Sequence, residues 1–501
     1  MCGIGGVWGG SEHAVVLNMM KQMVHRGPDA EGFYAGAYGC LGHRRLSIMD
    51  LVGGDQPIYD RGGIRAIVGN GELYNYPMLK RVLIQYREFM THSDTESALH
   101  LYEQLGQSAA EQLDGMFALA IADHDRLYLA RDPLGIKPLY YGYRGDKLVF
   151  ASELKAMVGA ADDVREFPPG HYYRTGEGFH RYHHFEAREP EPGSVTDHAR
   201  RVRTTLEHAV SKRLMSDVPV GAFLSGGLDS SLIAAIARRH VDRLHTFSVG
   251  LEGSPDLEAA RVVAAHLDTD HHEYVFTVEE VLEALPQIIY FLESFDQDLV
   301  RSAIPCYFVS RLAAEHVKVI LTGEGADEIF AGYAYYAGIR DVGQLHRELL
   351  RSVTSLHNIN LQRVDRLTMA HSLEGRVPFL DLKMVELAQT VPAELKLFAE
   401  SDGTLTAKWI LRKACEDLLP DEITWRRKEQ FDEGSGTADI MPQLLARAMS
   451  EPAAVGYRTA HPEARLRSAE ECTYHKILCE SYDDPRPVLA NVARWTDRPA
   501  A

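Results

Sequence analysis

The sequence predicts a two-domain α/β protein, and three observations support this fold class. A chain of 501 residues is too long for one hydrophobic core of ordinary size. Up to about residue 182 the segments are short, often β-branched and separated by glycine, which is typical of strands. After residue 195 longer helical periods alternate with apolar strands, which predicts a parallel sheet with helices on both faces.

The individual elements follow from the spacing of apolar residues and glycine. In the first half we expect strands at 64–68 and 117–121 and helices at 14–24, 76–85 and 95–105. In the second half the strand candidates are 220–224, 245–249 and 317–321. The charged, proline-containing stretch 186–195 has the composition of a linker, so we expect domains at 1–185 and 196–501.

Composition narrows the class of protein. An apolar content of 45% and a charged content of 25% are those of a globular protein, and no apolar run approaches the ~20 residues of a membrane span. A net charge of −18 argues against nucleic-acid or anionic-membrane partners. The six cysteines are scattered and suggest neither zinc nor disulfides, and the N-terminus lacks the features of a signal peptide. We therefore expect a cytoplasmic protein.

The start of the chain carries a candidate nucleophile. After removal of Met1, Cys2 would hold both a thiol and a free α-amine. The amine has a pKa of roughly 7.7–8.0, so near neutral pH it can accept the thiol proton and activate the sulfur. The alternative is that a cysteine at this position is an accident of the start site. The motifs in the rest of the chain distinguish these two interpretations.

Two glycine-containing loops in the second half predict a nucleotide site. The motif SGGLDSS at 225–231 follows an apolar strand and precedes a helix, so its glycines and hydroxyls can surround phosphate oxygens. It lacks the lysine of a GxxxxGK[ST] loop. The motif GEGADE at 323–328 follows another strand, and loops at the carboxyl ends of neighbouring parallel strands face one crevice. We expect Asp229 and Asp327 to bind Mg²⁺ there, although either loop alone could be a simple turn.

With these motifs in place, the chain from Cys2 to about Tyr482 resembles the glutamine-hydrolysing asparagine synthetases of the bacterial B type. The matching stretches in the first half are MCGI (1–4), HRGPD (25–29), RLSI (45–48), NGELYN (70–75), SDTE (93–96) and RDPLGIKP (131–138). In the second half they are SGGLDSS, GSPDL (253–257), GEGADE, RVPFLD (376–381) and RKEQF (427–431). The resemblance implies an N-terminal αββα sandwich of the Ntn-hydrolase type, which is a class II glutamine amidotransferase domain. It also implies a C-terminal ATP-pyrophosphatase domain built on a parallel α/β sheet.

The resemblance further implies roles for residues of the glutaminase half. Cys2 would attack the side-chain amide of glutamine, and Asn70 with the backbone N–H of Gly71 would stabilise the oxyanion. Arg45 would hold the α-carboxylate of glutamine and Asp94 its α-ammonium. The full glutamine-binding set would be Arg45, Asn70, Glu72 and Asp94, while His25 and Asp29 would only support the loop.

In the second half the resemblance implies an ATP site and the groups that act there. The ATP-binding residues would be Leu224, Ser225, Gly226, Gly227, Asp229, Ser230, Val249 and Gly323, with Asp229 and Asp327 as Mg²⁺ ligands. Glu324 would orient or deprotonate ammonia, and Lys428 would neutralise charge as pyrophosphate leaves, unless it belongs only to a solvated basic run. Ammonia from glutamine would pass internally to a carboxylate adenylated by ATP, giving an amide, glutamate, AMP and pyrophosphate.

One stretch departs from the family pattern. Bacterial and animal members usually carry a sequence like VTTIR, linked to aspartate recognition, where this chain has QDLVR at 297–301. Arg301 is retained as a candidate acceptor-binding residue. Asp298 is a further candidate, and the family pattern has no carboxylate at this position. The carboxylate of Asp298 would repel an anionic acceptor unless Asp298 contacts an ammonium group or another cation. Asp298 could instead point away, and aspartate remains the best single expectation for the acceptor.

Three functions are open from the sequence. The first is a glutamine-dependent asparagine synthetase, and the second is the same chemistry on another carboxylate in specialised metabolism. The third, a non-catalytic relative, is disfavoured because Cys2, Asp229, Glu324, Asp327 and Lys428 are all present. The expected partners are small molecules, namely glutamine, ATP and the acceptor, with a homodimer left open.

Overall fold

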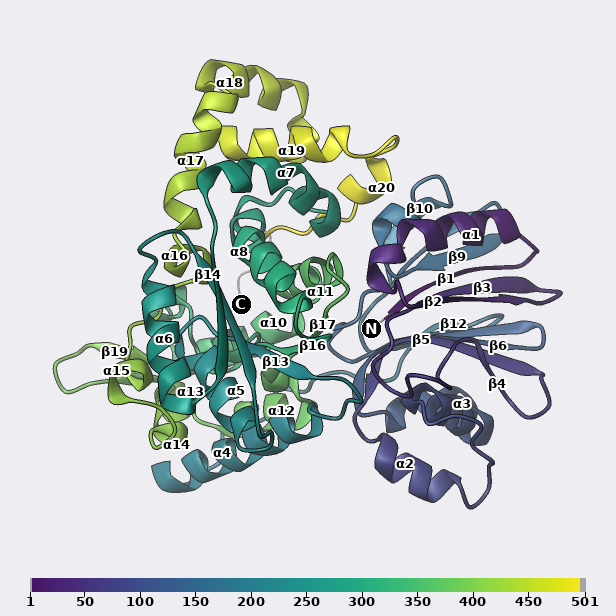
Figure 1. The fold of residues 1–501 in the computed structure, drawn as a ribbon, viewed down its shortest axis with the longest axis horizontal. Coiled ribbons are helices and arrows are strands. Elements are labelled where there is room, and N and C mark those ends of the chain that lie inside the picture. Colours follow the sequence, from purple (N-terminus) through teal and green to yellow (C-terminus); the bar gives the residue numbers. More distant parts are fainter. Residues whose placement is uncertain (1, 496–501) are drawn as a thin grey trace.

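The computed structural model describes residues 2–495, and at 439, 447 and 448 it describes the backbone alone. The chain forms two lobes that lie side by side (Figure 1). The first lobe, in purple and blue, holds two antiparallel sheets, and the second, in teal to yellow, holds a parallel sheet among helices. The predicted two-part α/β fold is therefore confirmed.

The first lobe is an αββα sandwich of two six-stranded sheets, with strand orders β10-β8-β9-β1-β3-β2 and β12-β11-β7-β6-β5-β4. Helix α1 (His13–Gln22) packs against β1 and β3, whereas α2 (Tyr76–Leu83) and α3 (Asp94–Leu105) lie over the second sheet (Figure 1). The central strand β1 is buried along its whole length, because α1 covers one face and the other sheet covers the opposite face. The strands are β1 (Cys2–Trp8), β2 (Ala30–Ala35), β3 (Gly39–Arg45), β4 (Ile58–Tyr59), β5 (Arg65–Leu73), β6 (Gly115–Asp123), β7 (Arg126–Arg131), β8 (Tyr140–Arg144), β9 (Lys147–Ala151), β10 (Asp162–Glu166), β11 (His171–Arg174) and β12 (Gly178–Arg181).

The second lobe is built on a five-stranded parallel sheet of order β15-β14-β13-β16-β17. Its strands are β13 (Val220–Phe223), β14 (His245–Gly250), β15 (Asp270–Val275), β16 (Val319–Leu321) and β17 (Glu374–Arg376), and β18 (Leu397–Ala399) pairs with β19 (Leu405–Ala407) apart from it. Helices α5 (Leu228–Arg238) and α6 (Pro255–Leu267) pack on one face, and α8 (Gln297–Ala314) and α11 (Asn360–Met369) on the other (Figure 1). The remaining helices are α4 (Val195–Lys212), α7 (Val278–Leu292), α9 (Ala326–Ile329), α10 (Val342–Thr354), α12 (Leu382–Thr390), α13 (Ala393–Lys396), α14 (Trp409–Cys415), α15 (Asp421–Thr424), α16 (Phe431–Gly434), α17 (Thr437–Ala448), α18 (Glu451–Ala460), α19 (Ala469–Glu480) and α20 (Arg486–Leu489).

Side-chain caps fix where several helices begin. Ser194 accepts a hydrogen bond from the Asp197 N–H, so α4 starts directly after the connection between the lobes. Thr277 and Glu280 form a reciprocal capping box at the start of α7, which satisfies two backbone N–H groups that the helix cannot pair internally. Between β12 and α4 the described chain has no regular secondary structure, in the region where the linker is predicted.

The expected elements are present, with some ends displaced. The strand expected at 64–68 continues further as β5 and carries the candidate oxyanion residues within it. The strand expected at 317–321 is shorter, because the N–H of Val317 still bonds to the helical carbonyl of Ala313. Between residues 2 and 495, no helix combines the length and the apolar character that crossing a membrane would need.

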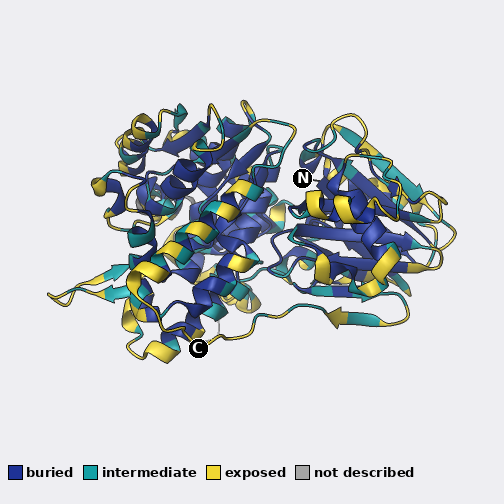
Figure 2. Ribbon diagram, turned by 90° about the horizontal axis from the view of Figure 1, so that it is seen from below, coloured by how far each residue is buried: buried dark blue, intermediate teal, exposed yellow. Residues whose placement is uncertain are grey.

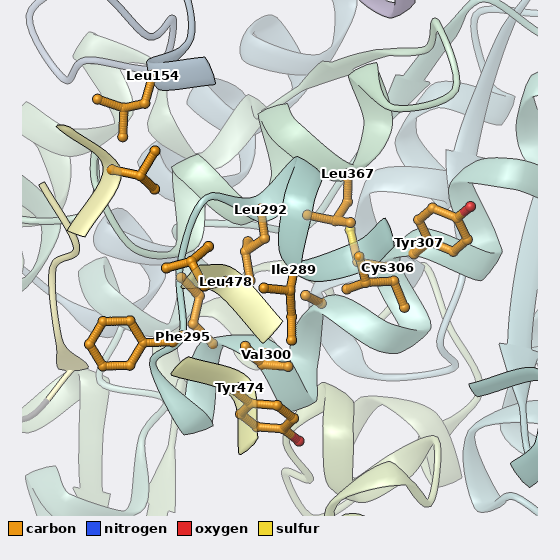
Figure 3. Packing of buried hydrophobic residues seen from close by; sticks show 14 of the residues in the cluster. Leu154, Ile289, Leu292, Phe295, Val300, Cys306, Tyr307, Leu367, Tyr474 and Leu478 are labelled. Carbon is orange, nitrogen blue, oxygen red and sulfur yellow. The ribbon is translucent and has the colours of Figure 1, made fainter. Parts of the chain in front are cut away.

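A hydrophobic cluster joins the two lobes. Buried residues fill the interior of each lobe (Figure 2). Leu154 of the first lobe belongs to the same buried cluster as Leu292 of α7, Val300 of α8 and Leu478 of α19 (Figure 3). The start of β1, marked N, lies where the lobes meet (Figure 1). The fold therefore places the candidate nucleophile next to the second lobe.

Candidate active sites

The candidate nucleophile and the candidate oxyanion residue are in contact. The backbone N of Cys2, at the start of β1, donates to Oδ1 of Asn70 at 3.0 Å. Both residues are buried, and burial raises the pKa of the Cys2 thiol, so the sulfur needs a base to become a thiolate. The Nδ2 of Asn70 is buried and has no hydrogen-bond partner among the described residues. This amide group is therefore available to donate to an oxyanion formed beside Cys2.

Gly71 occupies a backbone position that a side chain would not fit. Its φ of +146° is one that L-residues rarely adopt, and a Cβ there would lie 1.9 Å from the carbonyl oxygen of Met116. The residue lies in β5 opposite Phe117 of the neighbouring strand β6. The conformation of β5 at the oxyanion site thus depends on glycine at this position.

The predicted glutamine-binding residues surround the same end of the first lobe. Arg45 pairs with Cys2 in the register of β1 and β3, and its guanidinium bonds to Asp55 at 2.6 Å and to the carbonyls of the following loop. Asp94 is buried at the start of α3 and accepts hydrogen bonds from the N–H groups of Leu73 and Thr95. Burial raises the pKa of Asp94 to about 6.

Glu72 is also buried, and it faces a cation of the second lobe. Its Oε1 lies 3.5 Å from Nη2 of Arg376, and its Oε2 has no hydrogen-bond partner among the described residues. Burial, and then the neighbouring charge of Glu374, raise the pKa of Glu72. This carboxyl group connects the candidate glutamine site to β17 of the second lobe.

His25 and Asp29 have the supporting positions expected of them. Nε2 of His25 lies 2.9 Å from Glu153, and Oδ2 of Asp29 accepts the N–H of Ser47 at 2.7 Å. Asp29 also pairs with Lys318 of the second lobe at 2.8 Å. Both side chains are engaged in holding loops and lobes together.

The second candidate site is a cavity at the carboxyl ends of β13, β14 and β16. The predicted residues that line it are Leu224, Ser225, Gly227, Asp229, Ser230, Val249, Gly323, Glu324, Asp327 and Lys428. Gly226 is not among the lining residues; it has a φ of +68° and packs so closely on α6 that a Cβ would lie 2.4 Å from Ala259. A Cβ on Gly323 would lie 2.8 Å from Cβ of Asp229, so glycine lets the two loops approach each other. The two motifs therefore form one site.

Two lysines lie between the carboxylates expected to bind Mg²⁺. Lys408 contacts Asp229 and lies 2.6 Å from Oδ1 of Asp327, and Lys428 lies 3.1 Å from Oδ2 of Asp327. Although burial opposes ionisation, these lysines lower the pKa of Asp327 to about 2. Two carboxylates that converge beside the SGGLDSS loop are a donor set that fits Mg²⁺.

Among the cations of this cavity that the sequence analysis missed, Lys408 and Arg363 contact predicted site residues. Lys408 precedes α14 with a left-handed φ of +57° and belongs to none of the motifs. Arg363 of α11 lines the cavity and pairs with Glu324. The only sequence signal for either was a positive charge, so neither could be separated from solvated surface residues.

The structure does not bring the two candidate acceptor-binding residues into this cavity. Arg301 and Asp298 are absent from its lining, although Ser302 of the same helix α8 is present. The guanidinium of Arg301 bonds to both carboxylate oxygens of Glu470, at 2.8 and 2.6 Å. Asp298 pairs with Arg467 at 2.9 Å. Glu470 and Arg467 both belong to the α19 region, which packs across the start of α8. The charge of Asp298 is therefore balanced by a cation of the protein itself, Arg467.

Comparison with known proteins places these two sites in one family. The chain matches the glutamine amidotransferase domain over residues 1–168 and asparagine synthase over 201–340 and 337–487. It is 38% identical over 513 residues to asparagine synthetase B [glutamine-hydrolyzing] of Escherichia coli K12, covering 97% of this chain and 92% of that protein. The chain belongs to the glutamine-hydrolysing asparagine synthetases.

Plant members of the family are equally similar. Identity is 40% over 509 residues to asparagine synthetase [glutamine-hydrolyzing] 3 of Arabidopsis thaliana, covering 96% of this chain and 87% of that protein. It is 40% over 460 residues to the asparagine synthetase [glutamine-hydrolyzing] of Triphysaria versicolor, covering 87% and 78%. Family membership thus extends over both lobes of this asparagine synthetase homologue.

Proposed function

We propose that this member of the asparagine synthetase family hydrolyses glutamine at Cys2 and uses the ammonia, with ATP, to convert aspartate to asparagine. The observation that carries the proposal is the presence in one chain of a complete pair of sites. One has a buried thiol beside an amide donor that has no hydrogen-bond partner among the described residues, and the other has the SGGLDSS loop facing two carboxylates. We assign the first activity to residues 1–185 and the second to 196–501.

In the first lobe, removal of Met1 would free the α-amine of Cys2. The amine would take the thiol proton, and the sulfur would attack the glutamine amide carbon. The amine would return the proton to the leaving nitrogen as the C–N bond breaks and ammonia departs, and water would then hydrolyse the thioester to glutamate and free Cys2. Nδ2 of Asn70 and the N–H of Gly71 would donate hydrogen bonds to the oxyanion. In such sites these hydrogen bonds stabilise the transition state by several kcal/mol. Arg45 would bind the α-carboxylate and Asp94, in its ionised form, the α-ammonium.

In the second lobe, the hydroxyls and N–H groups of 225–230 would hold the phosphates of ATP. Bound by Asp229 and Asp327, Mg²⁺ would neutralise phosphate charge and so favour attack of the acceptor carboxylate on the α-phosphorus. Lys428 and Lys408 would stabilise the leaving pyrophosphate. Glu324 would orient ammonia as it displaces AMP from the acyl group.

A different carboxylate acceptor is not favoured. That alternative rested on Asp298, whose charge is paired with Arg467 rather than directed into the cavity. The three relatives described above, at 38–40% identity, are each named as an asparagine synthetase. Aspartate is therefore the acceptor that we propose.

The test is a product analysis of the intact enzyme and of Cys2→Ala. With glutamine, aspartate, ATP and Mg²⁺, the intact enzyme should form asparagine, glutamate, AMP and pyrophosphate in equal amounts. Cys2→Ala should lose the glutamine-dependent reaction and keep synthesis from ammonium, because the two sites are separate. Formation of ADP and phosphate, or a better turnover of another acid in a panel of carboxylates, would contradict the proposal.

A further inference from the structure

Three histidines from distant parts of the chain meet at the opposite end of the parallel sheet from the ATP cavity. His245 is the first residue of β14, His272 lies in β15, and His316 follows α8 before β16 begins. One ring nitrogen from each lies within 4.8 Å of the corresponding nitrogens of the other two. His245 is separated from Val249, at the ATP end of the same strand, by four residue steps or about 13 Å.

The closest pair already has the spacing of metal ligands. Nδ1 of His245 lies 3.1 Å from Nε2 of His272. Two nitrogens bound to one tetrahedral Zn²⁺ at about 2.0–2.1 Å lie about 3.3 Å apart, so this pair needs little movement. The ring of His316 stacks on that of His272 with centroids 3.9 Å apart. Bringing the third nitrogen to the same point requires rotation of the rings about χ2, which is a soft torsion in histidine.

A carboxylate lies beside two of these three histidines. Oδ2 of Asp270, the first residue of β15, lies 3.1 Å from Nδ1 of His245 and 3.7 Å from Nε2 of His272. It also pairs with Arg243 at 2.6 Å, but that side chain is 72% exposed and can move into solvent. Asp270 therefore offers a fourth ligand without a change in the backbone.

We propose that His245, His272, His316 and Asp270 bind one borderline divalent transition-metal ion, of which Zn²⁺ is the example to test. Three imidazoles and one carboxylate are ligands of the type that Zn²⁺ selects, whereas Mg²⁺ requires oxygen ligands. The site is chemically distinct from the carboxylate pair at the ATP cavity. A bound ion would join the neighbouring strands β14 and β15 to the α8–β16 connection, which is distant from them in sequence.

The experiment is a Zn²⁺ titration of full-length protein without a histidine tag, followed by calorimetry. Cys2→Ala is used throughout, because an N-terminal thiol and amine would themselves bind Zn²⁺, and excess Mg²⁺ occupies the carboxylates of the ATP cavity. We expect one equivalent of Zn²⁺ to bind. His272→Asn and His316→Asn should each weaken binding at least about tenfold, because loss of even a group that only supports a ligand typically costs about 10–100-fold in metal affinity.

The matched control is His124→Asn in the turn between β6 and β7 of the other lobe. His124 is exposed and has a φ of +53°, a conformation that asparagine tolerates. This variant should bind Zn²⁺ as the parent does. Thermal unfolding gives a second measurement, in which Zn²⁺ should raise the Tm of the parent and of His124→Asn but not of His316→Asn. Stoichiometric binding that survives both His272→Asn and His316→Asn, or no binding by the parent, would overturn the proposal.

Discussion

At the scale of single residues, the proposed role of Asp94 in glutamine binding predicts a dependence on pH. Burial disfavours its charged form and raises its pKa to about 6. The α-ammonium of glutamine attracts only the ionised carboxylate, so protonation of Asp94 competes with binding. In Cys2→Ala, the Kd for glutamine should be constant well above pH 6 and should rise about tenfold per pH unit below it. Calorimetric titrations between pH 5 and pH 8 would measure this, and a flat profile would contradict the assignment.

The matched variant for this measurement is Asp94→Asn. Leu73 and Thr95 donate to different oxygens of Asp94, so asparagine can keep one of these two hydrogen bonds, and it has no charge to titrate. At every pH its Kd for glutamine should be higher than that of the parent above pH 6, and it should not rise further as the pH falls.

Gly71 gives a second residue-scale prediction. In Gly71→Ala the new Cβ would meet the Met116 carbonyl at 1.9 Å, so β5 must shift and carry Asn70 with it. Displacing an oxyanion donor should lower glutamine-dependent kcat by about 10² or more, while ammonium-dependent synthesis stays within about twofold. The control is Gly63→Ala, where φ is also positive but no atom lies within 4 Å of the new Cβ. An equal loss of glutamine-dependent kcat in Gly71→Ala and Gly63→Ala would show that backbone strain alone, and not displacement of Asn70, causes the loss.

The residue roles divide into those a motif can predict and those it cannot. Asp229 and Asp327 were predicted to meet because each follows a strand whose neighbour is fixed by the parallel sheet. Lys408 was missed because it reaches Asp229 over a sequence separation of 179 residues, from a position with no local signature. A single sequence contains little information on side chains whose positions depend on tertiary packing rather than on a loop at the end of a strand.

At the scale of elements, the contact between α8 and the α19 region decides the role of the unusual Asp298. This side chain is 44% exposed, and its pair with Arg467 lies outside the cavity lining. Asp298→Thr should therefore leave kcat/KM for aspartate within about twofold, and lower the free energy of unfolding by less than about 1 kcal/mol. Steady-state kinetics and urea unfolding would measure the two quantities. A clear improvement with aspartate would show that Asp298 acts on the acceptor after all.

The comparison variant is Arg467→Met. Arg467 also pairs with the buried carboxylates of Asp296 and Glu471, at 3.1 and 2.8 Å. Its loss leaves buried charge without its partner and should lower the free energy of unfolding by about 3 kcal/mol. The sequence could not predict this arrangement, because α19 lies about 170 residues beyond α8 and nothing local specifies which elements pair.

At the scale of the whole molecule, the two lobes share a buried network of charge. Arg26 of the first lobe is fully buried and bonds to Glu153 and to Asp365 of α11, each at 2.7 Å. Its Nε also donates to the backbone carbonyl of Cys2 at 3.0 Å. One guanidinium thus ties the nucleophile strand to the second lobe. The sequence located Arg26 in a motif, but the carboxylate it meets in the other lobe depends on how the lobes dock.

Arg26→Gln should therefore affect both stability and the coupling of the two reactions. Removing Arg26 takes a buried cation away from the two carboxylates of Glu153 and Asp365, and we expect a loss of about 3 kcal/mol in the free energy of unfolding. Glutamine-dependent synthesis should fall more than ammonium-dependent synthesis, because the support of Cys2 is lost while the ATP cavity is untouched.

A double-mutant cycle with Asp365→Asn separates the contact across the lobes from general damage. If Arg26 and Asp365 stabilise each other directly, the double variant should be more stable than the sum of the single losses predicts, by about 1 kcal/mol or more. Lys137 lies 3.8 Å from Asp365 and Arg366 lies 3.2 Å from it, so part of the charge of Asp365 stays compensated in Arg26→Gln. The remaining cations therefore reduce the coupling free energy between Arg26 and Asp365, but they do not change its sign. Additive losses in urea unfolding would mean that docking of the lobes rests on the shared hydrophobic cluster and not on this ion pair.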